Sequence, residues 1–393
     1  MSPERVVLVA DRRSLDELCA RIAASDRVGL DTEFHTERSY APQLMVVQIA
    51  FEDGVAIVDP LAAGDLAPLA DALREPLVVG HALSGDLRIL QDRFERLPRA
   101  VFDTQIAAAF LGYGMQVSLT DLVHALCGVR LAKSQTVSDW SARPLSSRQL
   151  EYLVQDVAHL LPMHDLLQQR LRERGREEWV REECAALVDP RRYRADAESA
   201  YLRIQGAQRL NRRQLGILVE LVRLRDRIAR ARDVPPRYVL PDDVLTGLAT
   251  LRPKRLEDLA QLRRLDAGTR KALGEAILRA VAAGEAIPDD ELPEKPRRPE
   301  GPARETLAAL ASVVVGEIAR ANDLPAALLV SRAALERVAR EIPPDREALR
   351  TVLGISPWRA ALVLDPLWSL FSGTAALRVE GYAQGDPKIR LLP

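Results

Sequence analysis

The sequence predicts a mixed α/β domain followed by two all-α domains. Short, β-branched apolar runs alternate with amphipathic stretches in the first 175 residues, which is typical of a sheet flanked by helices. From about residue 196 onward the pattern has helical spacing and no strand signal, and one helical segment recurs after 90 residues. The chain has 393 residues, 47% of them hydrophobic, and is long enough for several domains with separate cores.

Four apolar runs in the first part have the length and composition of strands. The run at 44–51 is apolar at nearly every position, as expected for a strand covered on both faces. After Pro144 the pattern is helical as far as Leu171, with Ser146 and Ser147 as plausible caps. The predicted strands are 28–30, 44–51, 55–58 and 77–79, and the predicted helices include 15–24, 66–73 and 83–94.

The helical part contains an internal repeat. Residues 228–235, IARARDVP, return as IARANDLP at 318–325, and a repeated apolar spacing requires a repeated core. Between the copies, a segment rich in proline and charge predicts an extended linker, because proline is excluded from helix interiors. The predicted divisions are 1–175 (α/β domain), 176–204 (helical connector), 205–286 (first helical domain), 287–302 (linker), 303–373 (second helical domain) and 374–393 (C-terminal tail).

Charge is unevenly distributed, although the formal net charge is only −1. Residues 1–170 sum to −7, residues 171–393 sum to +6, and residues 201–280 alone carry +9. This excludes a uniformly basic protein and favours an anionic partner for the first helical domain. Arg223, Arg227 and Arg230 share one helical face there and could follow phosphates; the alternative is a solvated face in an arginine-rich chain.

The cysteines indicate a reducing compartment. Cys19, Cys127 and Cys184 lie far apart and form no CxxC pair, which argues against a disulfide framework and a zinc site. The sequence shows no secretory apolar region and no apolar run of the ~20 residues that a membrane span needs. We therefore expect a cytoplasmic protein with no membrane partner. No coiled-coil seam requires a dimer, so a monomer is the expected state.

Acidic residues occur at three separate places beside predicted strands and helices. Asp31 and Glu33 follow the strand at 28–30, and residues two apart on a strand project to the same face. Asp86 opens a predicted helix, and Tyr152 and Asp156 lie one turn apart on a later one. Each place alone has a plain structural explanation, such as solvated acids in a turn or a first-turn acid on a helix dipole.

Taken together, the four carboxylates could meet at one end of the sheet. Their hard oxygen ligands suit Mg²⁺ or Mn²⁺ rather than zinc. Two such ions roughly 3.5–4 Å apart can activate a water molecule and stabilise the departing oxygen of a phosphodiester, while Tyr152 would orient the attacking water. No competing chemistry is indicated, since the sequence has no GxSxG, Walker A or GxGxxG motif.

The motifs resemble the tyrosine-type DEDD family of 3′→5′ exonucleases, and the chain as a whole is similar to the bacterial ribonuclease D family. Glu151 stands where histidine-type relatives have histidine, which favours the tyrosine class. The two helical repeats look like HRDC domains. The matching segments are DTEF at 31–34, HALSGDL at 81–87, FDTQ at 102–105, Lys133-Ser134, SDWSARPL at 138–145 and YLVQDV at 152–157.

The resemblance implies a ribonuclease H-like fold, two divalent metal ions (Mg²⁺ or Mn²⁺) and trimming of tRNA precursors at the 3′ end. By residue-by-residue carry-over it makes Asp31, Glu33, Asp86 and Asp156 metal ligands, and Tyr152 the residue that positions the nucleophilic water.

Several residues in or near the matching segments have less certain roles. Lys133 and Arg143 could contact a backbone phosphate, with a solvated or structural role as the alternative. We expect Trp140 to anchor its loop against the helix, His81 to be a packed or surface histidine, and Gln48 to satisfy a buried backbone group.

Two alternatives to an RNA-trimming enzyme stay open at this point. The same active site could trim DNA, because such enzymes read the chain end mostly through phosphate, metal and sugar. The chain could also be a non-catalytic RNA-binding scaffold with a vestigial acidic cluster, although all five motif residues are present.

Overall fold

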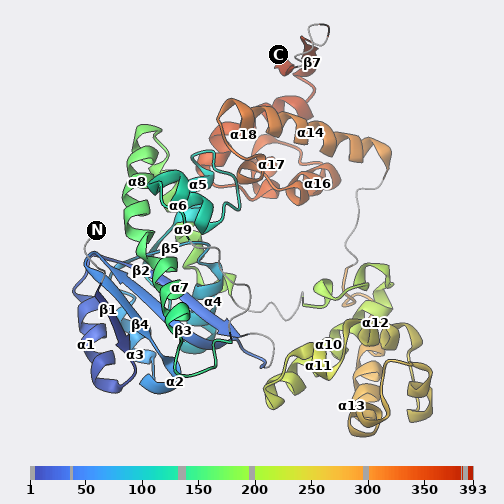
Figure 1. Ribbon diagram of the computed structural model, residues 1–393. Helices are drawn as coiled ribbons and strands as arrows, with labels where there is room; N and C mark the ends of the chain where they lie inside the picture. Colours follow the sequence, from blue (N-terminus) through green and yellow to red (C-terminus); the bar gives the residue numbers. More distant parts are fainter. Residues whose placement is uncertain are drawn as a thin grey trace.

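The computed structural model describes residues 5–35, 39–131, 139–193, 200–294, 301–381, 383 and 388–392. Its N-terminal part is built on a mixed six-stranded sheet (Figure 1), in the order β1-β4-β3-β2-β5-β6. β3 runs antiparallel to both of its neighbours, whereas the other pairs are parallel. This confirms the predicted mixed sheet. The strands are β1 (Arg5–Val9), β2 (Arg27–His35), β3 (Gln43–Phe51), β4 (Gly54–Val58), β5 (Leu77–Gly80) and β6 (Ala100–Asp103).

Helices pack against this sheet. α7 packs on β2, β3 and β4, and α8 packs on β2, β3 and β5. α7 begins at the predicted cap, because the Ser146 side chain accepts from the Gln149 N–H and Gln149 returns a bond to the Ser146 backbone. The helices of this part are α1 (Arg12–Ala23), α2 (Pro60–Ala63), α3 (Ala67–Ala72), α4 (Ser84–Phe94), α5 (Thr104–Ala109), α6 (Leu119–Cys127), α7 (Ser147–Ala158), α8 (Leu160–Glu173) and α9 (Glu177–Leu187).

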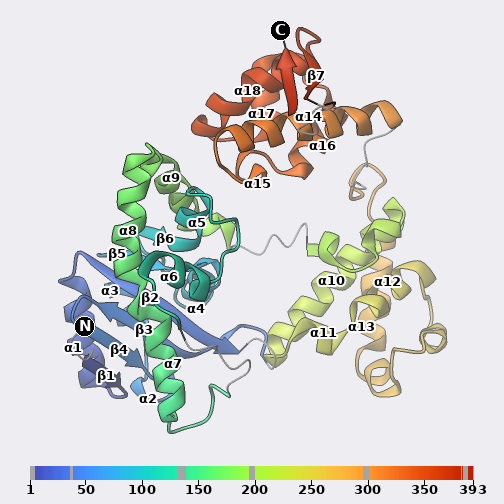
Figure 2. The same cartoon turned by 45° about the horizontal axis from the view of Figure 1, so that its top comes forward.

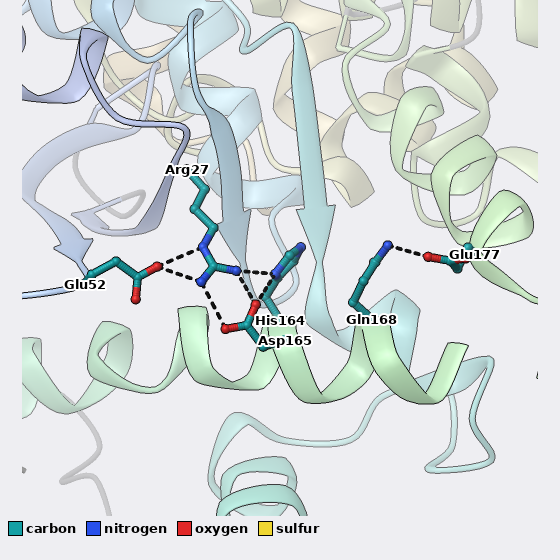
Figure 3. Close-up of polar contacts among 6 residues, drawn as sticks. All are labelled: Arg27, Glu52, His164, Asp165, Gln168 and Glu177. Atoms are coloured by element: carbon teal, nitrogen blue, oxygen red, sulfur yellow. Dashed lines mark hydrogen bonds and ion pairs between the residues drawn. The ribbon is translucent and has the colours of Figure 1, made fainter. Parts of the chain in front are cut away.

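A charged cluster fixes α8 to the first residue of β2 (Figure 3). The Arg27 guanidinium donates to Glu52 at 2.9 Å and forms an ion pair with Asp165 on α8. His164 lies against the same guanidinium and meets Phe102 of β6 edge-on, with ring centroids 4.6 Å apart. This cluster sets the position of α8, and therefore of the preceding α7, relative to the strand that carries two of the predicted site residues.

The repeat found in the sequence is also a repeat of structure. Each element of the second copy begins 90 residues after its counterpart in the first. The left-handed residue that ends the long helix recurs as well, Asp233 (φ 48°) in the first copy and Asp323 (φ 50°) in the second. The elements are α10 (Arg212–Arg232), α11 (Pro236–Val239), α12 (Asp242–Leu251), η4 (Leu256–Gln261) and α13 (Ala267–Glu285), then α14 (Pro302–Ala321), α15 (Ala326–Leu329), α16 (Arg332–Glu341), α17 (Arg346–Leu353) and α18 (Pro357–Phe371).

The two copies differ in how they pack. Buried apolar residues of the first copy form a core of their own, whereas those of the second are continuous with the core of the α/β domain. Trp358 of α18 stacks on Trp179 of α9 at 4.9 Å and meets Phe110 at 5.2 Å. An ion pair between Arg359 and Glu183, 2.6 Å apart, closes the same junction.

The first copy touches the α/β domain through the connection between β2 and β3 (Figure 2). The Tyr40 hydroxyl donates to Asp226 of α10 at 2.5 Å and accepts from Arg230 at 2.9 Å. The Tyr40 backbone N–H donates to Asp233 at the end of α10, 3.1 Å away. The first copy therefore contacts the connection between β2 and β3, and β2 carries Asp31 and Glu33 of the predicted site.

The expectation of no strands after residue 196 is wrong at the C-terminal tail. β7 (Ala376–Glu380) and β8 (Lys388–Leu392) form an antiparallel pair. Each is five residues long and alternates apolar with charged residues, a pattern too short to stand out beside the helical periodicity. β1 and β6, of five and four residues, were not predicted either. Of the helices in the described ranges, none combines the length and apolar character required to cross a bilayer.

Candidate active site

Three carboxylates from two elements meet on one face of the sheet. Asp31 and Glu33 alternate along β2 and project to the same side, where α7 brings Asp156 to them. One carboxylate oxygen of each residue lies within 4.8 Å of those of the other two. The β2–β3 register shifts between Glu33 and Phe34, and such a bulge redirects the side chains beside it.

Asp86 lies beside this trio. Thr32, which alternates with the two acids of β2, donates from its hydroxyl to Asp86 Oδ1 at 2.5 Å. Asp86 stands in the first turn of α4 and is 6% exposed. Its charge nevertheless reaches the trio, since it helps to raise the pKa of both Asp31 and Glu33. The structure therefore groups three of the four predicted acids closely, with the fourth held next to them by Thr32.

A buried aspartate, Asp103, determines where α4 begins. Its carboxylate accepts from the backbone N–H groups of Ala82 at 3.1 Å and Leu83 at 2.9 Å. It also caps α5 by accepting from Gln105 and Ile106. This aspartate lies in the FDTQ segment, for which the sequence analysis gave no role. Because two helix starts depend on one carboxylate, Asp103 positions Asp86 without reaching the site itself.

Tyr152 and Trp140 cover the carboxylates. The Tyr152 hydroxyl is hydrogen-bonded to Asp156, one turn further along α7. The Trp140 side chain is hydrogen-bonded to Glu33, and its ring lies 5.7 Å from that of Tyr152. Trp140 is only 8% exposed, which confirms that it anchors its loop against the helix. Its bond to Glu33 was not foreseen, because nothing in the spacing of the two residues signals it.

Burial and the neighbouring charges raise the pKa values of the site acids. Burial, followed by the charges of Asp86 and Asp156, raises the pKa of Asp31 well above its usual range and that of Glu33 to about 7. Burial also raises the pKa of Asp86 and of Asp156 to about 6. The pKa of Tyr152 is raised by burial and by the neighbouring carboxylates, so its hydroxyl stays protonated.

The donor set fits a hard divalent cation. The trio consists of carboxylates alone, all three half-buried, with neither cysteine nor histidine in the group. Acids that repel one another are stabilised in their charged forms by a cation between them, and Mg²⁺ and Mn²⁺ prefer oxygen ligands. The expectation of divalent-metal dependence therefore agrees with the chemistry of these residues.

Arg143 is half-buried, with 23% of its side chain exposed. Its guanidinium donates to both oxygens of Asp59, at 2.6 and 2.8 Å, and to the carbonyl oxygens of Trp140 and Met45. These bonds tie the loop that carries Trp140 to the end of β4. Sequence reasoning did not identify Asp59 as the partner of Arg143, because 84 residues separate the two.

The remaining nucleic-acid candidates are only partly described. Lys133 lies outside the described residues. Arg223, Arg227 and Arg230 are exposed on α10, as their spacing predicts, with Arg223 paired to Glu220 at 2.5 Å. The phosphate contacts of Arg143 and of this arginine face stay predictions.

Two further polar residues of the α/β domain are the half-buried His81 and the fully buried Gln48. His81 is a packed histidine, as expected, since its ring nitrogens lie 2.9 Å from Thr104 Oγ1 and 3.0 Å from the Val117 carbonyl oxygen. The expectation for Gln48 is wrong, because neither atom of its fully buried side-chain amide has a hydrogen-bond partner. The backbone groups around it are already paired within the sheet.

Comparison with known proteins agrees with this geometry. A family described as 3′-5′ exonuclease matches residues 6–172, and the HRDC domain family matches residues 214–281. Ribonuclease D of Acidiphilium cryptum (strain JF-5) is 39% identical, and the match covers 95% of each chain. The chain belongs to the ribonuclease D family. Ribonuclease D of Gluconacetobacter diazotrophicus is 38% identical over the same 95% of both chains.

A ribonuclease D is also among the solved structures that are similar to this chain. The crystal structure of Escherichia coli RNase D is 30% identical and superposes with a TM-score of 0.83, covering 94% of this chain and 99% of that one. Membership makes this chain a 3′→5′ exoribonuclease with an N-terminal exonuclease domain. Of the two expected HRDC domains, one is shown, in the first helical copy.

Proposed function

We propose that this ribonuclease D trims the 3′ ends of structured RNAs, with tRNA precursors as its favoured substrates. The observation that carries the proposal is the carboxylate trio of Asp31, Glu33 and Asp156, with Asp86 beside it. The related E. coli enzyme is described as an exoribonuclease involved in structured RNA processing, which supports structured RNA as the substrate class.

We further propose that Asp31, Glu33, Asp86 and Asp156 hold two divalent ions, Mg²⁺ or Mn²⁺. Such a pair supplies activation of the attacking water and stabilisation of the departing 3′ oxygen. The raised pKa values support this role, because a site that disfavours bare carboxylates gains most from a bound cation.

Tyr152 is our candidate for positioning the water molecule that attacks the phosphodiester. Its hydroxyl keeps its proton and is already hydrogen-bonded to Asp156, which fixes the oxygen at the edge of the trio. With its one proton donated to Asp156, the hydroxyl oxygen can still accept a hydrogen bond from a water molecule and so direct its approach. Trp140 would keep Glu33 in place on the other side.

The second helical copy is proposed to be an HRDC domain as well. The support is the constant offset of 90 residues between all five pairs of elements. Its residues 301–370 sum to zero charge, whereas residues 201–280 carry +9, so the proposed RNA contact belongs to the first copy. The monomeric state and the cytoplasmic location stay predictions.

The test combines site variants with two substrates. Asp31→Asn and Asp156→Asn should each abolish release of 3′ nucleotides from labelled RNA with Mg²⁺ or Mn²⁺. Asp16→Asn, an exposed acid on α1, is the control and should keep full activity. Full activity in either site variant would contradict the mechanism, and faster removal of nucleotides from a matched DNA strand would contradict the substrate.

A further inference from the structure

Gln48 lies at the centre of β3 with a side chain that nothing in the described structure satisfies. It is 0% exposed, and both Oε1 and Nε2 lack a hydrogen-bond partner. A buried amide without partners costs free energy, so an unpaired one in a well-formed core requires an explanation. One such explanation is a partner that becomes available only in the working state of the enzyme.

The register of the sheet places Gln48 directly opposite Asp31. The two residues are paired across the antiparallel β2–β3 ladder, so their side chains leave the same face of the sheet. Side chains in such a pair begin about 4.5–5.5 Å apart at Cβ, within reach of a carboxamide. Gln48 is therefore the nearest cross-strand neighbour of the most strongly perturbed acid of the site.

The same face is closed over by α7 and α8. Gly29, two residues before Asp31, has Ala50 and Leu160 of α8 so close that an added Cβ would lie 2.9 Å from Ala50 Cβ. On α7, Asp156 joins Asp31 and Glu33 on this side. Gln48 thus stands beneath the carboxylate trio, between strand and helix, and cannot turn outward to water.

A neutral donor is well suited to this position. Carboxylates that bind metal ions are usually held by further hydrogen bonds, which orient the ligand oxygens. An arginine or lysine next to Asp31 would compete with the cations for its charge. The carboxamide of Gln48 can instead donate an N–H to one carboxylate oxygen and leave the other free.

We propose that Gln48 is a positioning residue for Asp31, whose carboxylate it holds through its side-chain N–H when divalent ions bind. The proposal rests on the proposed role of Asp31 as a ligand. It predicts that the amide is unpaired in the metal-free protein and paired in the loaded one. The bond is expected to improve the affinity for metal rather than the stability of the metal-free fold.

The experiment measures Mn²⁺ binding by isothermal titration calorimetry on the full chain, together with urea unfolding in EDTA. Gln48→Met, which keeps the volume and removes the polar atoms, should weaken Mn²⁺ binding about tenfold, within the range typical of such outer partners. It should leave the metal-free protein as stable as the wild type or more so. Gln168→Met on α8 removes a glutamine bonded to Glu177 and is the matched control, with unchanged affinity.

Each outcome has a defined meaning. Unchanged Mn²⁺ affinity in Gln48→Met would overturn the proposal, whatever happens to stability. If this variant fails to fold, the Gln48 side-chain amide signal of the wild-type protein, followed by NMR during Mg²⁺ addition, takes its place; no shift would overturn the proposal. Asp31→Asn separates the role of Gln48 from the role of Asp31 as a ligand. If that variant keeps its Mn²⁺ affinity, the proposed ligand set itself is wrong.

Discussion

Arg143 binds both carboxylate oxygens of Asp59 side by side, Nε to Oδ2 at 2.6 Å and Nη2 to Oδ1 at 2.8 Å. Asp59 follows β4 and caps α2, whereas Arg143 closes the loop that carries Trp140. The Asp59 side chain is 9% exposed, so the pair is screened from water. This pair connects the sheet to the loop that covers the candidate site.

Replacing Arg143 with lysine should destabilise the protein. A lysine cannot form the two parallel bonds, so buried acceptors lose their donors at a cost of about 1–3 kcal/mol in the free energy of unfolding. Urea unfolding measures this loss. Arg191→Lys is the control, because Arg191 also donates to both oxygens of Asp189 but is 83% exposed and should change stability little. Equal effects in the two variants would contradict the role of Arg143.

Trp140→Phe should slow the enzyme without unfolding it. Phenylalanine keeps most of the ring beside Tyr152 but cannot donate to Glu33, whose pKa would rise further. We expect kcat on 3′-labelled RNA to fall about tenfold, the value of one charge-assisted hydrogen bond, with KM little changed. Trp368→Phe on α18 should leave both constants unchanged. A wild-type kcat in Trp140→Phe would show that this bond is dispensable.

The metal-free enzyme should lose stability as the pH rises from about 4 to about 7. Glu33, Asp86 and Asp156 have pKa values raised from 4.5, 3.8 and 3.8 to about 7, 6 and 6. Across this window the folded protein binds more protons than the unfolded chain, so the free energy of unfolding decreases with pH. Urea unfolding in EDTA should show this decrease, and Asp156→Asn should reduce it relative to Asp16→Asn. An identical pH dependence in both variants would contradict the assignment.

The arginine face of α10 can be tested by its salt dependence. Arg223→Glu combined with Arg227→Glu should weaken RNA binding at least tenfold at low salt and lower the slope of log affinity against log salt by one to two. Arg332→Glu with Arg346→Glu makes the same charge change in the second copy and should have a smaller effect. Filter binding at several salt concentrations measures both. If the α10 variant binds RNA with unchanged affinity, the arginine face is a solvated surface and does not contact RNA.

The sequence predicted those parts of the fold that depend on local pattern. The four predicted strands are present, Ser146 caps α7, and the 90-residue repeat returns element by element. β1, β6 and the β7–β8 pair were missed, although β4 and β5, which are as short, were predicted. The trio of Asp31, Glu33 and Asp156 also follows from strand and helix periodicity, once the strand is placed beside the helix.

Contacts between distant residues could not be predicted in this way. The bonds of Trp140 to Glu33, of Arg143 to Asp59 and of Thr32 to Asp86 depend on tertiary packing, and no spacing signals them. Gln48 is the clearest case, because an isolated polar residue in an apolar strand suggested an ordinary backbone contact. Only the strand register shows that it stands opposite Asp31.

The unequal packing of the two helical copies limits how this chain can change over evolutionary time. The first copy encloses its own core and meets the exonuclease domain through the hydrogen bonds and ring contacts of Tyr40, so it could be lost or exchanged with modest disturbance. The second cannot, because its removal would expose Trp179 and Phe110 to solvent. Of the two repeated domains, the first could therefore fold apart from the exonuclease domain, whereas the second is part of its hydrophobic core.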